Sequence, residues 1–352
     1  MTVKRLINLK RAEARKIYLT YAVVIVAYVI CQIMSSTKFF SSSMRGMLVP
    51  ICAYMVMAVS LNLVVGILGE LSLGHAGFMS VGAFAGVTSA ILMQGVITNA
   101  PLRLALAMII AAIFAAIAGF LIGIPVLRLK GDYLAIVTLA FGEIIKSVLN
   151  NFYFGVDAQG LHFSMLSDTT RLLKGGRLII RGPMGISGIQ KISTFPAGFI
   201  LLMIALMIVF NLVNSRSGRA FMAIRDDRIA AESIGLDITK YKMMAFVMSA
   251  AIAGAAGALF AMNYSTVVAN KFDFNTSILI LVFVVLGGQG NMLGSIIAAA
   301  VLTILPEKLR EFSEYRMLLY AIVLIVMMLA TNNAEIKSFL AGLNPFRRKE
   351  DA

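Results

Sequence analysis

Long apolar segments separated by short polar ones make up most of this sequence. Ten of these segments are apolar enough to be read as membrane-spanning helices, although the eighth and ninth are short for a full crossing. The ten segments are residues 17–34, 47–68, 73–95, 102–127, 133–150, 196–213, 241–263, 276–287, 293–306 and 315–330. The pattern predicts an all-α polytopic membrane helical bundle of about ten transmembrane helices, which we expect to form one domain over residues 1–352.

Basic residues before the first apolar segment indicate how the chain is oriented. They are Lys4, Arg5, Lys10, Arg11, Arg15 and Lys16, against the single acid Glu13. The segment is long for a signal-peptide core and many spans follow, so we read it as a retained helix. With an even number of spans, the positive-inside rule places both termini in the cytoplasm. Residues 151–195 are then an external (periplasmic) loop, and residues 215–242 are a cytoplasmic loop.

Composition agrees with this assignment and narrows the class of function. The chain is 60% hydrophobic and 14% charged, with a mean hydropathy of +0.90, values typical of an integral membrane protein. The net charge of +14 lies between apolar spans, as the positive-inside rule requires, so we expect no nucleic-acid partner. Cys31 and Cys52 lie in separate apolar segments without metal-ligand or redox spacing. We expect neither a metal site nor a cofactor.

Small residues recur at helical spacing in three of the predicted spans. The longest such ridge consists of Ala107, Ala111, Ala115, Gly119 and Gly123, and shorter ridges consist of Gly82 with Gly86 and of Ala250, Gly254 and Ala258. Small-xxx-small ridges let helix backbones approach closely within a membrane. They predict tight packing and carry no transport chemistry of their own.

The cytoplasmic loop 215–242 is the main polar segment of the chain. Ser217 is expected to cap a helix of about four turns, and Gly235 is expected to end it in the left-handed conformation. In this reading Arg225 and Arg228 share one helix face, while Phe221 and Ile224 form an apolar side for another protein's groove. The segment could equally be a solvated loop with internally paired charges.

Two glycine-rich links interrupt the apolar segments of the sequence, at residues 66–78 and 287–295. Freed backbone groups in broken membrane helices must face protein or a water-filled path, so these links are candidates for the substrate path. The candidate residues are Gly69, Glu70, Ser72, Gly74, His75, Gly288, Gln289, Gly290 and Asn291. The alternative is that each link is only a turn that reverses the chain.

Few ionisable residues lie within the spans, and each would be costly in hydrocarbon. Glu143 and Lys146 are three residues apart on one helix face, and we expect them to neutralise each other. His75 lies near Glu70 in sequence, and the two could form a structural pair or line the path. For a zwitterionic substrate, Ser72 and the glycines could bind the carboxylate through free N–H donors, with Glu70 receiving the ammonium group.

The external loop 151–195 carries mixed charge and turn signals. The run Gly182-Pro183-Met184-Gly185 is typical of a turn, and residues 178–180 are typical of a strand in a small hairpin. Such a loop could dock a substrate-delivery protein or could be an exposed tether.

Four stretches of the chain resemble the branched-chain amino acid permease family of ATP-binding-cassette importers. Residues 127–144 read LRLKGDYLAIVTLAFGEI and are the most specific of the four; the others are LSLGHA at 71–76, GGQG at 287–290 followed by LPE at 305–307, and the GRA and AAE runs at 218–220 and 230–232 with Gly235. The first of these indicates the M-type permease subunit. Glu70 stands where the family usually has glutamine, and Met184 where an asparagine is common.

The resemblance implies a fold, partners and a mechanism. The architecture would be like that of the vitamin B12 importer permease, in a bacterial inner membrane. A second permease subunit, two cytoplasmic ATP-binding subunits and a periplasmic solute-binding protein would complete the complex, which carries hydrophobic amino acids by alternating access. Loop 215–242 would be the coupling helix that contacts the ATPase, through Arg219, Arg225, Asp226, Asp227, Arg228, Ala231, Glu232 and Gly235. Glu232→Arg or Gly235→Pro would then abolish uptake.

Other functions remain open at the level of sequence. The chain has no GxxxxGK[ST] phosphate loop, so we expect a conduit rather than an enzyme, with ATP hydrolysed by a partner. A permease for urea or short amides would share these features. A proton-coupled secondary transporter would use Glu143, Glu70 or His75 as its relay. A membrane scaffold would need only the small-residue ridges.

Overall fold

The computed structural model of the protein describes residues 3–37, 41–129, 131–157, 160–165 and 176–309, and residues 318, 321, 322 and 325. The chain divides into two compact units, Met1–Ala299 and Ala300–Ala352. The elements within residues 3–287 belong to the first unit, and the division falls within the helix Met292–Lys308. A single domain over residues 1–352 stays a prediction.

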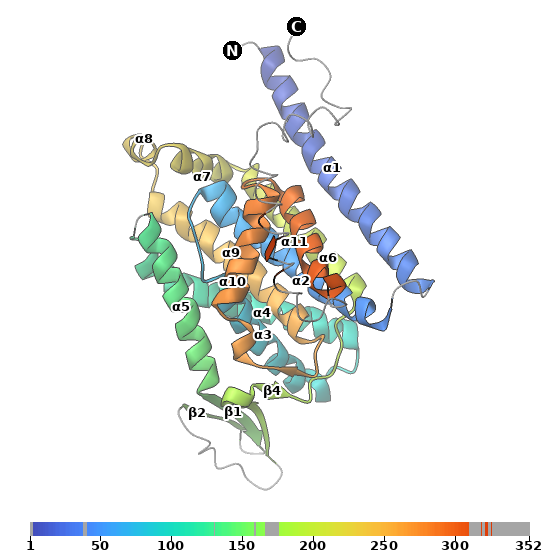
Figure 1. Ribbon diagram of the computed structural model, residues 1–352. Helices are drawn as coiled ribbons and strands as arrows, with labels where there is room; N and C mark the ends of the chain where they lie inside the picture. Colours follow the sequence, from blue (N-terminus) through green and yellow to red (C-terminus); the bar gives the residue numbers. More distant parts are fainter. Residues whose placement is uncertain are drawn as a thin grey trace. The chain divides into compact units, whose positions relative to one another are not determined.

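Helices form most of the first unit, and Figure 1 shows their arrangement. The α-helices are α1 (Val3–Ser36), α2 (Ser42–Asn62), α3 (His75–Leu92), α4 (Ala100–Val126), α5 (Asp132–Asn150), α6 (Phe195–Val213), α7 (Arg216–Asp226), α8 (Arg228–Ser233), α9 (Ile238–Ala261), α10 (Phe274–Gly287) and α11 (Met292–Lys308). A π-helical turn, η1 (Leu63–Leu68), extends α2, and short 3-10 turns lie at η2 (Met93–Gly95), η3 (Gly182–Met184) and η4 (Ala269–Lys271).

The predicted membrane helices are confirmed where the structure describes them. Eight helices of the described residues are long and apolar enough to cross a membrane, and they correspond to the first eight predicted segments. The ninth segment is α11, which has 17 residues. The tenth, at 315–330, lies almost wholly outside the described residues. The all-α polytopic bundle predicted from the sequence is therefore the observed fold class.

The core of the bundle is formed by α9 and the helices that contact it, α2, α3 and α4. Within their apolar windows, 89% of the α2–η1 residues and 72% of the α9 residues are buried, against 22% for α4 and 11% for α1. The first two helices are thus interior, while α4 and α1 present most of their surface outwards. A helix that is apolar all round can be either interior or lipid-facing, and only packing distinguishes the two.

The three predicted ridges of small residues meet one another in this core. A Cβ atom built on Gly82 of α3 would lie 2.2 Å from the carbonyl oxygen of Gly254 in α9. One built on Gly254 would lie 2.3 Å from the Cβ atom of Ala115 in α4. Glycine is therefore required at both positions for the backbones of α3, α4 and α9 to come this close. The prediction that the ridges are packing devices is confirmed.

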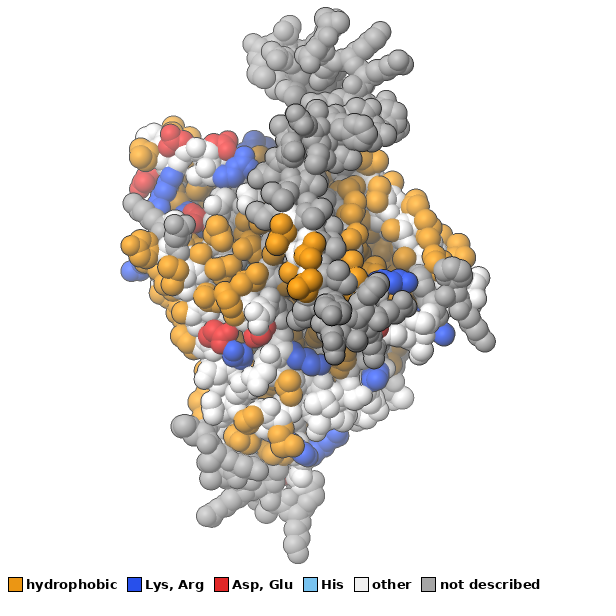
Figure 2. Space-filling model, in the orientation of Figure 1, with side chains coloured by type: hydrophobic (Ala, Val, Ile, Leu, Met, Phe, Trp, Pro, Cys, Tyr) orange, Lys and Arg blue, Asp and Glu red, His pale blue; other side chains and the backbone are white. Residues whose placement is uncertain are grey.

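The outward face of α4 carries large apolar side chains at the same four-residue spacing. Ile109, Ile113, Ile117 and Leu121 are 52% to 61% exposed, on the side opposite the small-residue ridge. Figure 2 shows a broad apolar band on the visible face, with charged groups gathered beyond it over α7 and α8. Such a band is the surface expected of a protein that sits in a bilayer.

A small antiparallel sheet lies at the end of the bundle away from α7 and α8 (Figure 1). Its strands are β1 (Phe152–Asp157), β2 (Gly160–Met165), β3 (Arg177–Arg181), β4 (Ile186–Ser187) and β5 (Thr266–Val267), in the order β2-β1-β3-β4-β5. The strand predicted at 178–180 is confirmed as β3, and the turn predicted at 182–185 is η3, with Gly182 and Gly185 at positive φ. The sequence did not predict the other strands.

The close approach of α3 to α9 generates a stability prediction. We expect Gly82→Ala to destabilise the protein by about 1–3 kcal/mol, because the added methyl group overlaps the Gly254 carbonyl. Gly46→Ala is the matched control, since a Cβ atom there meets nothing within 4 Å, and alanine is the better helix former by roughly 0.5–1 kcal/mol. Thermal unfolding in detergent checks both. Equal melting temperatures for the two variants would contradict the packing account.

Candidate functional site

The polar loop 215–242 folds into two short helices rather than the single helix expected. Ser215, not Ser217, caps the first helix, α7, by accepting hydrogen bonds from the N–H groups of Ser217 and Gly218. Asp227 is extended, and its carboxylate accepts from the N–H groups of Ile229 and Ala230, which starts α8. Gly235 has φ +84° and ends the segment as predicted. An aspartate that caps the following turn competes with continuation of the helix, which explains the break.

The break changes which side chains of this segment face outwards. Phe221 and Ile224 were expected to face a partner, but they are buried within the chain at 0% and 4% exposure. Phe221 packs edge-on against Tyr241, and Ile224 belongs to an apolar cluster with Ala231 and Ile238. The expectation that Arg225 and Arg228 share one helix face is also wrong, because the two residues lie in different helices.

The exposed apolar residues of this segment are two that sequence reasoning missed. Ile229 is 80% exposed and Ile234 is 75% exposed, at either end of α8. We call residues 227–235 the α8 tip. The sequence did contain a signal for them, because both isoleucines stand apart from other large apolar residues in a mostly polar segment. The predicted coupling residues that are exposed beside them are Arg219, Arg225, Asp226, Asp227 and Glu232.

Arg225 joins α7 to the first glycine link. Its Nη1 atom donates a hydrogen bond to the carbonyl oxygen of Gly66 at 3.3 Å, while Nε and Nη2 bind the carboxylate of Asp226 at 3.1 and 3.0 Å. The Arg225 stem also packs on Gly69, where a Cβ atom would lie 2.5 Å from Cγ and where φ is +80°. The coupling segment and the first glycine link, which the sequence presented as separate features, are therefore in direct contact.

The two glycine links also meet each other, through Asn62. The side chain of Asn62 is fully buried. Its Oδ1 atom accepts from the N–H group of Gly290 at 2.8 Å, and its Nδ2 atom donates to Ser295 at 2.8 Å. A Cβ atom on Gly66 would lie 2.2 Å from the Gly290 nitrogen. Sequence reasoning missed Asn62, although a lone asparagine in an apolar span is itself a signal.

Gly288 and Gly290 both have positive φ, of 90° and 82°, and they shape the tight turn from α10 into α11. Asn291 accepts a hydrogen bond from the N–H group of Gly294 and so caps the first turn of α11. Gln289 is exposed. The local geometry of the second link is that of a turn, and a role for it in the substrate path stays a prediction.

Glu70 has a partner within the chain. It forms an ion pair with Lys242 of α9, whose side chain is 2% exposed against 15% for Glu70. A buried ammonium group needs a nearby counter-charge, so the pair explains why a carboxylate occupies position 70. Sequence reasoning missed Lys242, which lies at the start of an apolar span. Contact between Glu70 and a substrate ammonium group stays a prediction.

His75 is fully buried and binds α2 and α9 rather than Glu70. Its Nε2 atom lies 2.9 Å from the hydroxyl oxygens of both Ser60 and Ser249. Each serine hydroxyl also donates to the other's carbonyl oxygen, at 2.7 and 2.6 Å, so Nε2 is the hydrogen donor. The Nδ1 atom has no hydrogen-bond partner among the described residues. The geometry favours the structural alternative for this histidine.

Two N–H donors at the start of α3 are occupied. The Leu73 N–H group donates to Thr138 at 3.0 Å, and the Ala76 N–H group donates to Ser277 at 3.2 Å. Free donors were expected here, so that expectation is wrong for these two groups. Ser72 Oγ is buried and without a partner among the described residues. A Cβ atom on Gly74 would lie 2.1 Å from the Thr138 carbonyl oxygen, so a bulky replacement there would displace α5 rather than fill an open path.

Glu143 and Lys146 form an ion pair with each other on α5, as predicted. Because the two charges balance each other, neither side chain needs a substrate or a relayed proton to neutralise it.

Comparison with known proteins identifies relatives of the chain. Residues 43–331 match the family model described as branched-chain amino acid transport system / permease component. The chain is 38% identical over 292 residues to the high-affinity branched-chain amino acid transport system permease protein LivM of Salmonella typhimurium, and equally to that of Escherichia coli. Each match covers 78% of this chain and 66% of the relative, slightly under two thirds of its length.

A more distant relative is named for a different solute. The chain is 24% identical over 244 residues to the fructose import permease protein FruG of Bifidobacterium longum, which covers 66% of this chain and 67% of the relative. No solved structure matches the chain significantly.

The buried ion pair generates a stability prediction for this site. Glu70→Gln should destabilise the protein by about 3–5 kcal/mol, because Lys242 is left as a buried charge without its partner. From the family resemblance alone, which places glutamine at this position, the change would instead be expected to be tolerated. The double variant Glu70→Gln with Lys242→Met should recover most of the loss, which thermal unfolding of the single and double variants measures. Additive effects of the two changes would contradict the pairing.

Proposed function

Because this chain belongs to the branched-chain amino acid transport permease family, we propose that it is the membrane-spanning subunit of an ATP-driven importer. The solutes are branched-chain, hydrophobic amino acids, which cross by alternating access. The 38% identity to two permeases named for these amino acids supports the choice of solute. The fructose permease relative makes a sugar the competing solute that an experiment has to exclude.

The contact between Arg225 and Gly66 is the observation that supports this proposal most strongly. It joins a polar segment outside the apolar bundle to the bent end of α2, and Asn62 continues the connection to the turn between α10 and α11. A push on α7 is transmitted to three membrane helices along this route. Switching proteins use packed, two-state elements of this kind to convert motion at one site into rearrangement at another.

The subunits of the proposed complex are those that the family resemblance implies. The α8 tip seats in one of two cytoplasmic ATP-binding subunits, and nucleotide-driven closure of those subunits moves α7. A second permease subunit completes the pathway beside this chain, and a periplasmic solute-binding protein delivers the amino acid to the end that carries the sheet. The chain is a multi-pass membrane protein, and we place it in a bacterial inner membrane with both termini in the cytoplasm.

Uptake into vesicles tests the proposed function. We expect the reconstituted complex to take up leucine, isoleucine and valine when ATP and binding protein are supplied, and to ignore fructose and urea. A proton ionophore should leave this uptake unchanged, because Glu143 and His75 already have partners within the chain. Uptake of fructose instead of amino acids, or loss of uptake with the ionophore while ATP stays high, would contradict the proposal.

The exposed isoleucines of the α8 tip generate a docking prediction. Replacing both, Ile229→Ser with Ile234→Ser, should release the ATP-binding subunits from the purified complex. An apolar anchor at an interface is typically worth about 1–3 kcal/mol, so the pair should weaken binding by at least roughly tenfold. Thr239→Ser, at an exposed position in the first turn of α9, is the control. Full retention of the ATP-binding subunits by the double variant would show that the α8 tip is not the docking site.

A further inference from the structure

Arg103, in the first turn of α4, is a buried cation whose hydrogen-bond acceptors among the described residues are neutral. It is 5% exposed. Its Nη2 atom donates to the amide oxygen of Gln190 at 2.7 Å, and its Nη1 atom lies 3.5 Å from the carbonyl oxygen of Ile97. None of the ion pairs between described residues includes Arg103. A buried charge without a counter-charge is costly, which makes this a place where a bound anion would be strongly favoured.

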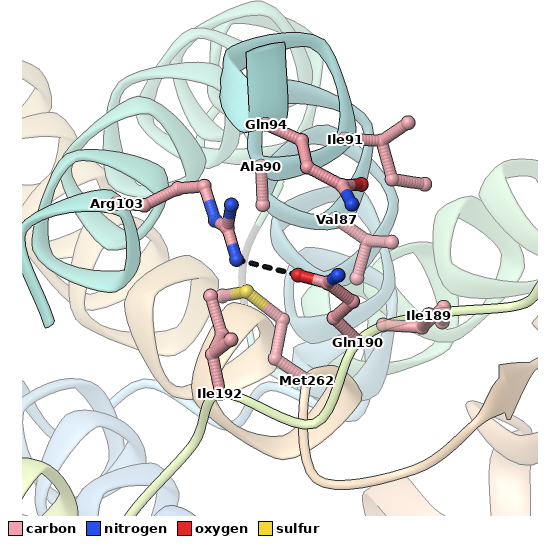
Figure 3. Close-up of a pocket in the computed structure, with 9 residues that line it drawn as sticks. All are labelled: Val87, Ala90, Ile91, Gln94, Arg103, Ile189, Gln190, Ile192 and Met262. Atoms are coloured by element: carbon pink, nitrogen blue, oxygen red, sulfur yellow. Dashed lines mark hydrogen bonds between the residues drawn. The ribbon is translucent and has the colours of Figure 1, made fainter. Parts of the chain in front are cut away.

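The guanidinium group borders two hollows that share Gln94, Gln190 and Ile192 in their walls. Figure 3 shows the residues that line the first of them. The inner recess is lined by the apolar side chains of Val87, Ala90, Ile91, Ile189 and Met262, and its volume of about 10 Å³ holds roughly one water molecule. The outer hollow is open, has a volume of about 530 Å³ and adds Thr98 and Lys191 to the polar groups. A small polar molecule can therefore reach Arg103 from outside.

This site lies at the end of the bundle opposite α7. The helix α3 starts at the link contacted by Arg225, and its other end leads through η2 to the start of α4. Gln190 lies between β4 and α6, on the same side as the sheet. In the proposed orientation this is the external end, where a solute arrives.

We infer that Arg103 binds the carboxylate of an incoming amino acid at the external face of the permease. The guanidinium group and Lys191 supply the positive charge, and the amides of Gln94 and Gln190 reach into the same space (Figure 3). The adjoining apolar recess matches an aliphatic side chain in character, and it is closed to anything larger than water in this structure. The inference rests on the proposed function for the identity of the solute, and on the unpaired charge of Arg103 for the carboxylate.

Gln190→Glu is the sharpest variant, because it supplies a carboxylate from within the chain at the observed 2.7 Å contact. The new ion pair should leave the protein as stable as the wild type or more so, while it competes with an external carboxylate. If Arg103 served only to stabilise the fold, the same change would stabilise the fold further. Gln190→Met, which removes the hydrogen bond without adding charge, is the matched control, and Arg181→Gln controls for loss of an exposed charge at this end.

Thermal stability of the purified permease in detergent reads out binding with defined probes. L-Leucine and 4-methylpentanoate, which both carry a carboxylate, should raise the melting temperature of the wild type, and isoamylamine should not. In Gln190→Glu and in Arg103→Gln, the probe concentration that gives half of the maximal rise in melting temperature should increase by about tenfold or more. This is the effect expected from the loss of one charge-assisted contact. Arg181→Gln should respond like the wild type, and Gln190→Met, which loses only a neutral contact, should raise this concentration by less than Gln190→Glu does.

Three results would overturn the inference. They are an equal response of wild type and Gln190→Glu, no response of the wild type to either carboxylate, and a response confined to short-chain phosphatidylglycerol, which would make Arg103 a lipid headgroup site. Uptake separates this inference from the proposed function. If the complex imports another solute while 4-methylpentanoate still acts through Arg103, only the proposed function fails. If ATP-driven leucine uptake keeps its KM in Gln190→Glu, only the carboxylate site fails.

Discussion

The bent end of α2 depends on the hydrogen bonds of one buried side chain. Where α2 passes into the π-helical turn η1 and then reverses at Gly69, backbone groups lose their regular partners, and hydrocarbon offers none in exchange. Asn62 provides two hydrogen bonds in this region: it accepts one from the N–H group of Gly290 and donates one to the hydroxyl of Ser295. Each such bond contributes roughly 1 kcal/mol net, but leaving the buried groups unpaired would cost more. The constraint fixes where the turn between α10 and α11 lies.

Arg225 extends the same constraint to the surface. The guanidinium group binds the carbonyl oxygen of Gly66 while its stem packs on Gly69, so α7 is held to the backbone of the bend rather than to an adaptable side chain. The contact requires glycine at both positions, because a Cβ atom at either would overlap its neighbours. A rigid link between an exposed helix and a broken membrane helix is what mechanical coupling requires. The close contacts of α3, α4 and α9 form a tightly packed core. We expect α7 and the bend after α2 to move relative to this core.

The sequence predicted the features that depend on local pattern. Apolar length identified the membrane helices, four-residue spacing of alanine and glycine identified the packed ridges, and Gly235 ended its segment as expected. Features that depend on three-dimensional partners were missed. Lys242 lies 172 positions from Glu70 and Asn62 lies 228 positions from Gly290, so no local pattern pairs them. Arg103 was passed over because a charge at the start of an apolar segment is normally read as a membrane boundary.

The division of the polar loop into α7 and α8 was missed for a different reason. Asp227 can either continue a helix or cap the next one, and the burial of Ile224 and Ala231 in one cluster selects the second option. That selection made Phe221 and Ile224 interior and left Ile229 and Ile234 exposed. The candidate docking surface therefore follows from tertiary packing rather than from helix periodicity.

The central claim is that α7 and the bend after α2 move as one body during the transport cycle. Spin labels on cysteines introduced at the exposed positions Arg219 and Leu71, with Cys31 and Cys52 replaced by serine, report the distance across the Arg225 contact. A second pair at Arg219 and Val96 reports the distance from α7 to the far end of α3. With nucleotide bound to the complex, the first distance should stay unchanged while the second changes. A first distance that changes as much as the second would contradict the account.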